Sequence, residues 1–198
     1  MSKSTVISQK SSPFTTKSLV YCAMLAAIQI VIARFVSITP MPGVRFSLEA
    51  VPVVLAGLLF GPIAGMTVGF GADFIGCMFQ PFGYNPLFCL PPILYGLFGG
   101  LMRNYVSEKT NFLRVFLAYL PAVILGSILW QSFTLAYVYN SKGAFMESLM
   151  VKLSTRCVQF GIAWPVEALI TTLLLKSGIF QGLKLWPSSK NVTEKTEA

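Results

Sequence analysis

Long apolar runs separated by short polar connections form most of the chain. A helix that crosses a bilayer needs about 20 largely apolar residues, and fewer where surrounding protein shelters it. Six runs meet this requirement, and they cover residues 18–38, about 46–60, 63–78, about 87–102, 112–139 and about 150–175. The pattern predicts an all-α membrane protein with six transmembrane helices.

Two of the breaks between the runs contain residues that end helices. Gly61-Pro62 separates the second run from the third, because proline cannot continue a helix interior. Residues 80–86, with the sequence QPFGYNP, form a turn-rich connection between the third and fourth runs. These breaks support counting short segments as separate helices.

The composition indicates lipid as the solvent of the folded chain. The 198 residues are 55% hydrophobic and only 11% charged, whereas soluble domains carry roughly 25% charged residues. So few charges cannot cover the surface of a domain in water. The same composition argues against a disordered chain, a coiled coil or a nucleic-acid-binding module.

The net charge of +8 comes mostly from the flanks of the apolar runs. Ten Lys and Arg residues fall at the two chain ends and between the fourth and fifth runs, against three on the opposite side. Because cytoplasmic flanks are enriched in Lys and Arg, we expect both termini of this multi-pass protein in the cytoplasm. The expected division is a flank at 1–17, a membrane domain at 18–178 and a tail at 179–198.

Most common enzyme motifs are absent from the sequence. It has no histidine, no phosphate-binding G-x-x-x-x-G-K-[ST] motif and no C-x-x-C pair, so we expect no metal site, no cofactor and no catalysis. An intramembrane carboxylate enzyme using Asp73 and Glu167 is the less favoured alternative. The position of Glu167 stays open: it could face a pocket, pair with Arg156 or brace Pro165.

Polar residues of the apolar runs gather toward the predicted outer half. Such groups are costly in lipid and usually face a cavity or a partner, so they indicate a cup open to the outside. An alternative is that the cations and acids form ion pairs that only hold helices together. The residues are Arg34, Arg45, Glu49, Asp73, Gln80, Tyr84, Asn85, Trp130, Gln131 and Arg156.

Small residues mark close helix packing. Glycines at 57, 61, 65 and 69 keep an i+4 spacing that Asp73 continues, which predicts that Asp73 faces the bundle. Ala23 and Ala27 form a similar pair near the cytoplasmic end of the first run. Internal packing is the simplest interpretation of both patterns.

Four stretches resemble the substrate-binding S component of energy-coupling factor (ECF) vitamin transporters, and most of all its folate-binding branch. They are RFVSI (34–38), GVRFS (43–47), LAGLLFGPIAGMTVGFGADFIGCMFQPFGYNP (55–86) and YGLFGG (95–100). The resemblance covers roughly residues 15–178, and its LFGP...G...G...AD core is the most specific part.

The resemblance implies a six-helix S-component-like bundle in a prokaryotic plasma membrane, with an outward-facing cavity for a vitamin. It also implies partners: a transmembrane coupling protein and two ATPase subunits that hydrolyse the ATP. Ala23 and Ala27 match the family's pair that docks on the coupling protein. The loop at about 39–47, with its bend at Pro40, Pro42 and Gly43, matches the loop that gates the pocket.

Folate chemistry is compatible with the polar residues, although the choice of folate comes from the resemblance. Its glutamate carboxylates could pair with the three arginines. The N–H and amino group of its pterin ring could donate to Asp73, or else to Glu49, and its flat rings could pack against aromatic side chains. Another flat-ring vitamin, such as riboflavin or thiamine, is the alternative. The candidate substrate-binding residues are Arg34, Arg45, Phe46, Glu49, Asp73, Gln80, Tyr84, Asn85, Phe88, Trp130, Gln131, Arg156, Gln159 and Trp164.

Overall fold

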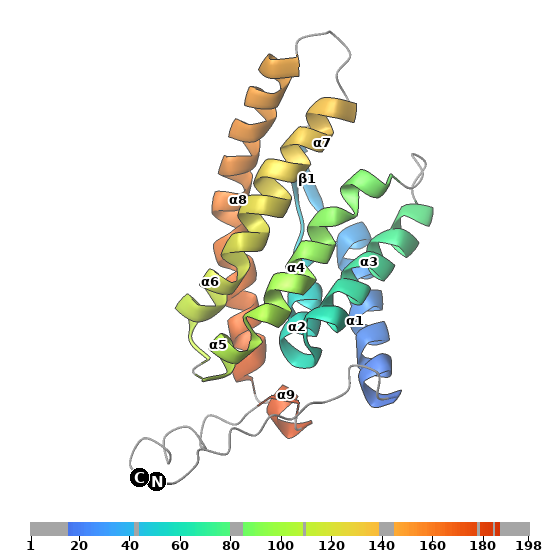
Figure 1. Ribbon diagram of the computed structural model, residues 1–198, viewed down its shortest axis with the longest axis vertical. Coiled ribbons are helices and arrows are strands. Elements are labelled where there is room, and N and C mark those ends of the chain that lie inside the picture. The colour runs from blue at the N-terminus through green and yellow to red at the C-terminus, as the bar shows by residue number, and fades with distance from the viewer. Residues whose placement is uncertain are drawn as a thin grey trace.

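The computed structural model describes residues 16–41, 44–79, 85–108, 110–138, 145–177, 179–183 and 185–186. Within these ranges each of the six predicted runs is helical, so the predicted all-α bundle is confirmed (Figure 1). The main helices are α1 (Thr16–Phe35), α2 (Ala50–Phe60), α3 (Pro62–Met78), α4 (Leu90–Leu101), the continuous α6 (Phe112–Ala122), η2 (Val123–Trp130) and α7 (Gln131–Val138), and α8 (Phe145–Lys176).

The helices differ in how much lipid they can meet. Three described segments are long and apolar enough to cross a membrane, namely Thr16–Phe35, Phe112–Val138 and Phe145–Lys176. The shorter α2 is buried along its whole length. A helix that neighbouring helices shelter does not need to match the full bilayer thickness, which explains how α2 can remain short.

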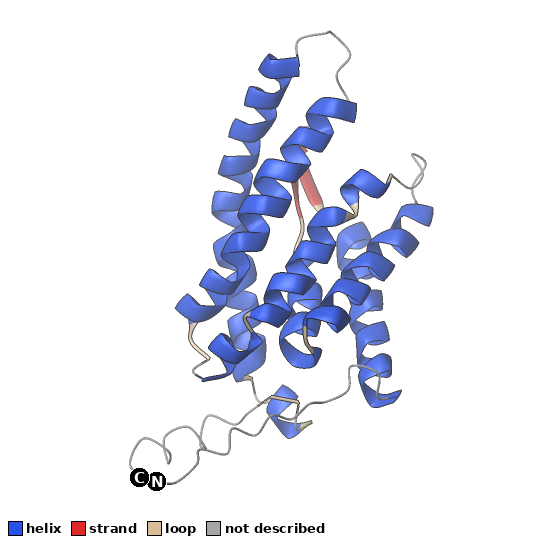
Figure 2. Ribbon diagram, viewed as in Figure 1, coloured by secondary structure: helices blue, strands red, loops and turns tan. Residues whose placement is uncertain are grey.

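The connections hold structure that the hydrophobic pattern did not predict. Short helices occupy two of them, η1 (Pro86–Phe88) and α5 (Arg103–Glu108), and a third, α9 (Ile179–Gly182), lies in the predicted tail. The strands β1 (Ile38–Met41) and β2 (Val44–Phe46) pair antiparallel and are drawn in red in Figure 2; we call this pair the hairpin. The second helix consequently begins at Ala50, and the predicted start at residue 46 was wrong.

Glycines bring α2, α3 and α4 into backbone contact. A Cβ atom built on Gly96 of α4 would overlap the backbone of Gly65 on α3, and one on Gly57 of α2 would lie 2.7 Å from the backbone nitrogen of Gly100. Gly61, between α2 and α3, has a φ of 102°, which favours glycine. These helices therefore form one tightly packed half of the bundle.

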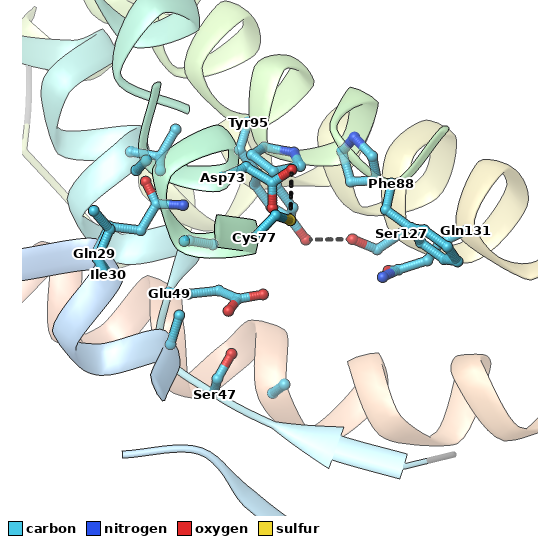
Figure 3. A pocket seen from close by; sticks show the side chains of 18 of the residues that line it. Gln29, Ile30, Ser47, Glu49, Asp73, Cys77, Phe88, Tyr95, Ser127 and Gln131 are labelled. Carbon is cyan, nitrogen blue, oxygen red and sulfur yellow. Dashed lines mark hydrogen bonds between the residues drawn. The ribbon is translucent and has the colours of Figure 1, made fainter. Parts of the chain in front are cut away.

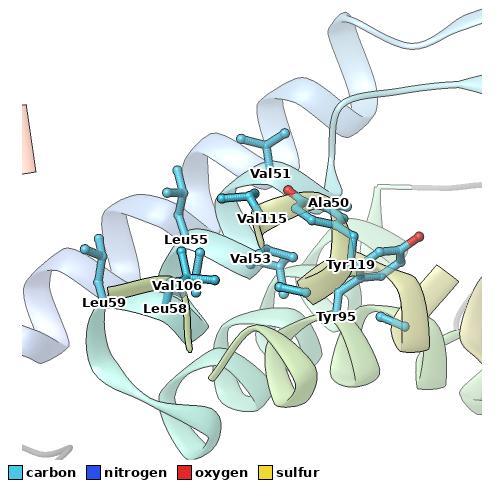
Figure 4. Close-up of a cluster of buried hydrophobic side chains, with 14 of the residues drawn as sticks. Ala50, Val51, Val53, Leu55, Leu58, Leu59, Tyr95, Val106, Val115 and Tyr119 are labelled. Atoms are coloured by element: carbon cyan, nitrogen blue, oxygen red, sulfur yellow. The ribbon is translucent and has the colours of Figure 1, made fainter. Parts of the chain in front are cut away.

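The second half consists of α6, η2, α7 and α8. The two halves separate toward the end of the bundle away from α5 and α9, and the hairpin lies between them (Figure 1). At the other end they meet in an apolar core, where α2 packs against Val106, Val115 and Tyr119 (Figure 4). This arrangement closes the bundle at the core end, and the two halves diverge away from it (Figure 1).

The glycine contacts predict how the bundle responds to one added methyl group. Gly96→Ala should lower the free energy of unfolding by about 1–3 kcal/mol, because backbone atoms of α3 cannot move aside as a side chain could. Thermal unfolding in detergent, followed by monodispersity on a sizing column, measures the change.

Gly71→Ala on α3 is the matched control, since a Cβ there meets no atom within 4 Å. It should be as stable as the parent protein or more stable by up to about 1 kcal/mol, because alanine favours a helix interior over glycine. Equal losses in both variants would contradict the backbone-contact interpretation of the glycines.

Candidate functional site

A cavity of about 620 Å³ lies between the two halves of the bundle. Its walls come from the end of α1, the start of α2, the second half of α3, the start of α4, the η2–α7 region and the middle of α8 (Figure 3). Small-molecule sites usually have volumes of about 300–1,000 Å³. The cavity is thus large enough for a cofactor-sized ligand.

Charged side chains from four helices or their ends reach this cavity. Arg34 and Arg156 provide cations, and Glu49, Asp73 and Glu167 provide acids. In a membrane-spanning bundle such groups usually face water, a ligand or each other. Their convergence makes the cavity the candidate binding site.

Arg34 lies where α1 packs on α3. A Cβ atom on Gly76 would be only 2.8 Å from Nη2 of Arg34, so this glycine leaves the space that the guanidinium occupies. One turn earlier on α3, Asp73 Oδ2 accepts a long contact of 4.0 Å from the Sγ of Cys77. The α1–α3 contact therefore places a cation and an acid in the same wall.

Gln29 is a cavity residue that the sequence analysis did not select. It lies on α1 between Leu25 and Arg34, is 5% exposed, and reaches the cavity as Glu49 does from the start of α2 (Figure 3). Its Oε1 has no hydrogen-bond partner among the described residues. The available signal was an amide inside an otherwise apolar run.

Tyr95 and Ser127 were also missed. The Tyr95 hydroxyl and Ser127 Oγ lie 2.9 Å apart and join α4 to η2 within the cavity lining (Figure 3). Ser127 belongs to a π-helical stretch, and such stretches frequently occur at functional sites. Neither the π-helical geometry nor the pairing of residues 32 positions apart has a sequence signature.

One face of α8 contributes five cavity residues. Arg156, Gln159, Phe160, Ala163 and Glu167 are spaced as neighbours along a single helix face. The Arg156 guanidinium carbon lies 6.0 Å from the centre of the Phe160 ring, at the limit of a cation–π contact. Glu167 is 2% exposed and lines the cavity from a buried position.

Hydrogen bonds behind the cavity fix the backbone of α8 at Glu167. Thr171 Oγ1 donates to the Glu167 carbonyl oxygen at 2.8 Å. Tyr119 Oη lies 2.6 Å from Thr171 Oγ1. Because the threonine proton is already used, the Tyr119 hydroxyl must be the donor of this bond. The chain of bonds ties α6 to α8 at the level of Glu167.

Two aromatic residues that were predicted to line the cavity instead hold neighbouring helices together. Trp130 Nε1 donates to the Leu87 carbonyl oxygen at 2.8 Å and joins η2 to η1. Trp164 stacks on Phe116 with 3.9 Å between ring centres, and its Nε1 donates to the Phe116 carbonyl oxygen. Phe46, at the end of β2, also lies outside the lining.

The remaining sequence candidates fall into three groups. Gln80 and Tyr84 lie outside the described residues, and only the backbone of Arg45 is described, in β2. Ala23 and Ala27 are exposed on α1. The candidates that the structure brings together in the cavity lining are Arg34, Glu49, Asp73, Asn85, Phe88, Gln131, Arg156 and Gln159.

Comparisons with known proteins connect this fold to vitamin transport. Residues 13–176 match the family model of the ECF-type riboflavin transporter, S component. The folate transporter FolT of Clostridium novyi (strain NT) is 28% identical over 157 residues, covering 77% of this chain and 84% of the relative. A UPF0397 protein of Streptococcus pneumoniae (strain CGSP14) is 32% identical over 93 residues, 47% of this chain and 51% of that protein.

A solved structure supports the same relationship. The crystal structure of FolT bound with folic acid superimposes with a TM-score of 0.66 at 26% sequence identity. The match covers 81% of this chain and 93% of the other. Most of the bundle described above is therefore shared with that protein.

The Tyr119 network predicts a measurable stability change. Tyr119→Phe removes the hydroxyl that donates to Thr171 Oγ1, and it should lower the free energy of unfolding by about 1 kcal/mol. Tyr137→Phe is the control, because Tyr137 is 66% exposed. Thermal unfolding of both variants in the same detergent gives the comparison, and an unchanged Tyr119→Phe midpoint would contradict the network.

Proposed function

The chain belongs to the ECF-type riboflavin transporter S component family, and on this premise we propose that it binds folate for an ATP-driven ECF uptake transporter. The observation that carries the proposal is the charged cavity within a bundle that superimposes on folic-acid-bound FolT. The protein would capture folate with high affinity outside the cell and perform no catalysis itself.

The charges of the cavity suit the two ends of folate. Its glutamate carries two carboxylates, which guanidinium groups bind with paired, charge-assisted hydrogen bonds. Arg34 and Arg156 line the cavity and are proposed for this role, with Arg45 of the hairpin as a third cation. Glu49 and Asp73 offer acceptors to the N–H and amino groups of the pterin ring. Phe88 is the aromatic residue of the lining that we propose to contact a flat ring.

A second candidate ligand is riboflavin, which the printed description of the family names. It has a flat ring system of suitable size, so the cavity volume alone does not separate the two vitamins. Riboflavin carries no carboxylate, however, and offers the cavity arginines no anionic group to bind. Folate offers two carboxylates, and charge-assisted hydrogen bonds are stronger than neutral ones, which favours folate.

We further propose that the S component docks on a transmembrane coupling protein through α1. Ala23 and Ala27 are exposed on a helix whose exposed face also carries Val20, Met24 and Val31. Two small residues at i and i+4 permit close approach of a second helix in lipid. The coupling protein would connect this chain to two ATPase subunits, with both termini of this chain in the cytoplasm.

The ligand proposal predicts the order of affinities in a vitamin panel. Folic acid, riboflavin, thiamine and pantothenate should be titrated into the purified protein in detergent, with intrinsic tryptophan fluorescence as the signal. Folic acid should bind well below about 1 μM, which corresponds to more than about 8 kcal/mol of binding free energy. If no vitamin binds in this range, or if riboflavin binds far more tightly than folic acid, the proposal fails.

The docking proposal predicts a separation of binding from transport. The double variant Ala23→Trp, Ala27→Trp should bind folic acid normally while energised uptake by the complete transporter is lost, because the indoles hold the coupling helix away. Binding is measured by fluorescence titration, and uptake is measured in proteoliposomes that contain all subunits.

The matched control is Leu169→Trp with Leu173→Trp on α8, where both leucines are exposed and share the i, i+4 spacing. It should retain binding and uptake. Loss of folate binding in the alanine variant would return Ala23 and Ala27 to internal packing.

A further inference from the structure

Two buried acceptor atoms in the cavity have no partner among the described residues. They are Oε1 of Gln29 on α1 and Oε2 of Glu167 on α8. Both side chains are at least nine-tenths buried, at 5% and 2% exposed. A buried acceptor without a hydrogen bond is costly, so these atoms indicate donors that a ligand brings.

Three protein donors near Glu167 serve other acceptors. Tyr119 donates to Thr171, whose own proton goes to the Glu167 backbone carbonyl. Trp164 Nε1, in the preceding turn of α8, donates to the Phe116 carbonyl oxygen. These bonds fix the backbone of residue 167. They do not use the carboxyl oxygens of Glu167, which can accept hydrogen bonds from a ligand.

Glu167 lies at the inner end of the cavity. Its neighbour Ala168 belongs to the apolar core, whereas Arg156 is eleven residues closer to the open end of the bundle. Eleven residues of an α-helix span about 16 Å at 1.5 Å per residue. The cavity therefore offers a cation toward its open end and a carboxyl at its floor.

We infer that Glu167, in place of Asp73 or Glu49, is the specificity-determining residue of the site. It accepts hydrogen bonds from the ligand edge that enters deepest, and Gln29 is a second acceptor. The ligand class is a flat heterocycle whose buried edge carries a ring N–H next to an amino group. Two parallel donors match the two oxygens of a carboxyl group. This assignment rests on the proposed function, because the pterin of folate has such an edge.

The same geometry discriminates against the isoalloxazine ring of riboflavin. The N–H of that ring stands between two carbonyl groups, so a carboxyl at the floor would face two further acceptors. Unpaired buried acceptors are a strong source of rejection in binding sites. Glu167 thereby supplies a second reason for ligand choice, in addition to the arginines.

A ligand pair tests the assignment. Folic acid and its analogue with a methyl group in place of the 2-amino group should be titrated into the wild type, Glu167→Gln and Glu147→Gln. Glu167→Gln should weaken folic acid binding about tenfold to a hundredfold, while affinity for the analogue changes less than about threefold. Glu147, an exposed acid in the first turn of the same helix, is the matched control and should have no effect.

Stability of the ligand-free protein provides an independent measurement. Glu167→Gln should unfold at the same temperature as the wild type or higher, because an amide is less costly to bury than a carboxylate without a partner. Should Glu167→Gln not fold, Glu167→Asp retains the carboxyl but withdraws it by one methylene. That variant should then show the same selective loss for folic acid.

Four results would overturn the assignment. Equal weakening of both ligands by Glu167→Gln would do so, as would a selective loss in Asp73→Asn with none in Glu167→Gln. Normal folic acid binding by Glu167→Gln would remove the assignment while leaving the proposed function intact. A wild-type protein that binds neither ligand would overturn both.

Discussion

Backbone contact between α3 and α4 determines where space is left in this bundle. Lipid supplies no hydrophobic drive for helix association, so helices gain stability by close approach. Glycines 65 and 96 allow the two backbones to touch, and Gly57 extends the contact to α2. At these glycines one half of the bundle is thereby packed backbone against backbone. The other half contacts it chiefly through the core around Tyr119, and the cavity occupies the remaining separation.

The fold was predictable because hydrophobic length and helix-breaking residues act locally. Gly61-Pro62 and the turn before Pro86 divided the short helices correctly. The pairing of β1 with β2 was not predicted, since the strands are only four and three residues long and depend on each other. Helix starts differed where polar residues such as Glu147 fit into a first turn.

The sequence predicted a charged cavity, but it did not predict every residue that lines it. Charge in an apolar run is a strong signal, and it selected Arg34, Asp73 and Arg156, which line the cavity. Trp130 and Trp164 carried an equally strong aromatic signal, yet their indoles bond to backbone carbonyls on neighbouring helices. Which way a side chain points depends on helix rotation, and rotation is set by tertiary contacts that one sequence does not display.

The π-helical stretch at Val123–Trp130 gives the fifth span a different pitch in its middle. Its hydrogen bonds join residues i and i+5 instead of i and i+4, so each hydrogen-bonded loop contains one residue more than in an α-helix. Downstream residues are consequently rotated relative to those of α6, and Gln131, Leu135 and Val138 face the cavity in this rotated register. Removing one residue from the stretch would turn α7 by about 100°, the step of one α-helical residue. Which residues of α7 face the cavity thus depends on the length of the π-helical stretch before them as well as on their own identity.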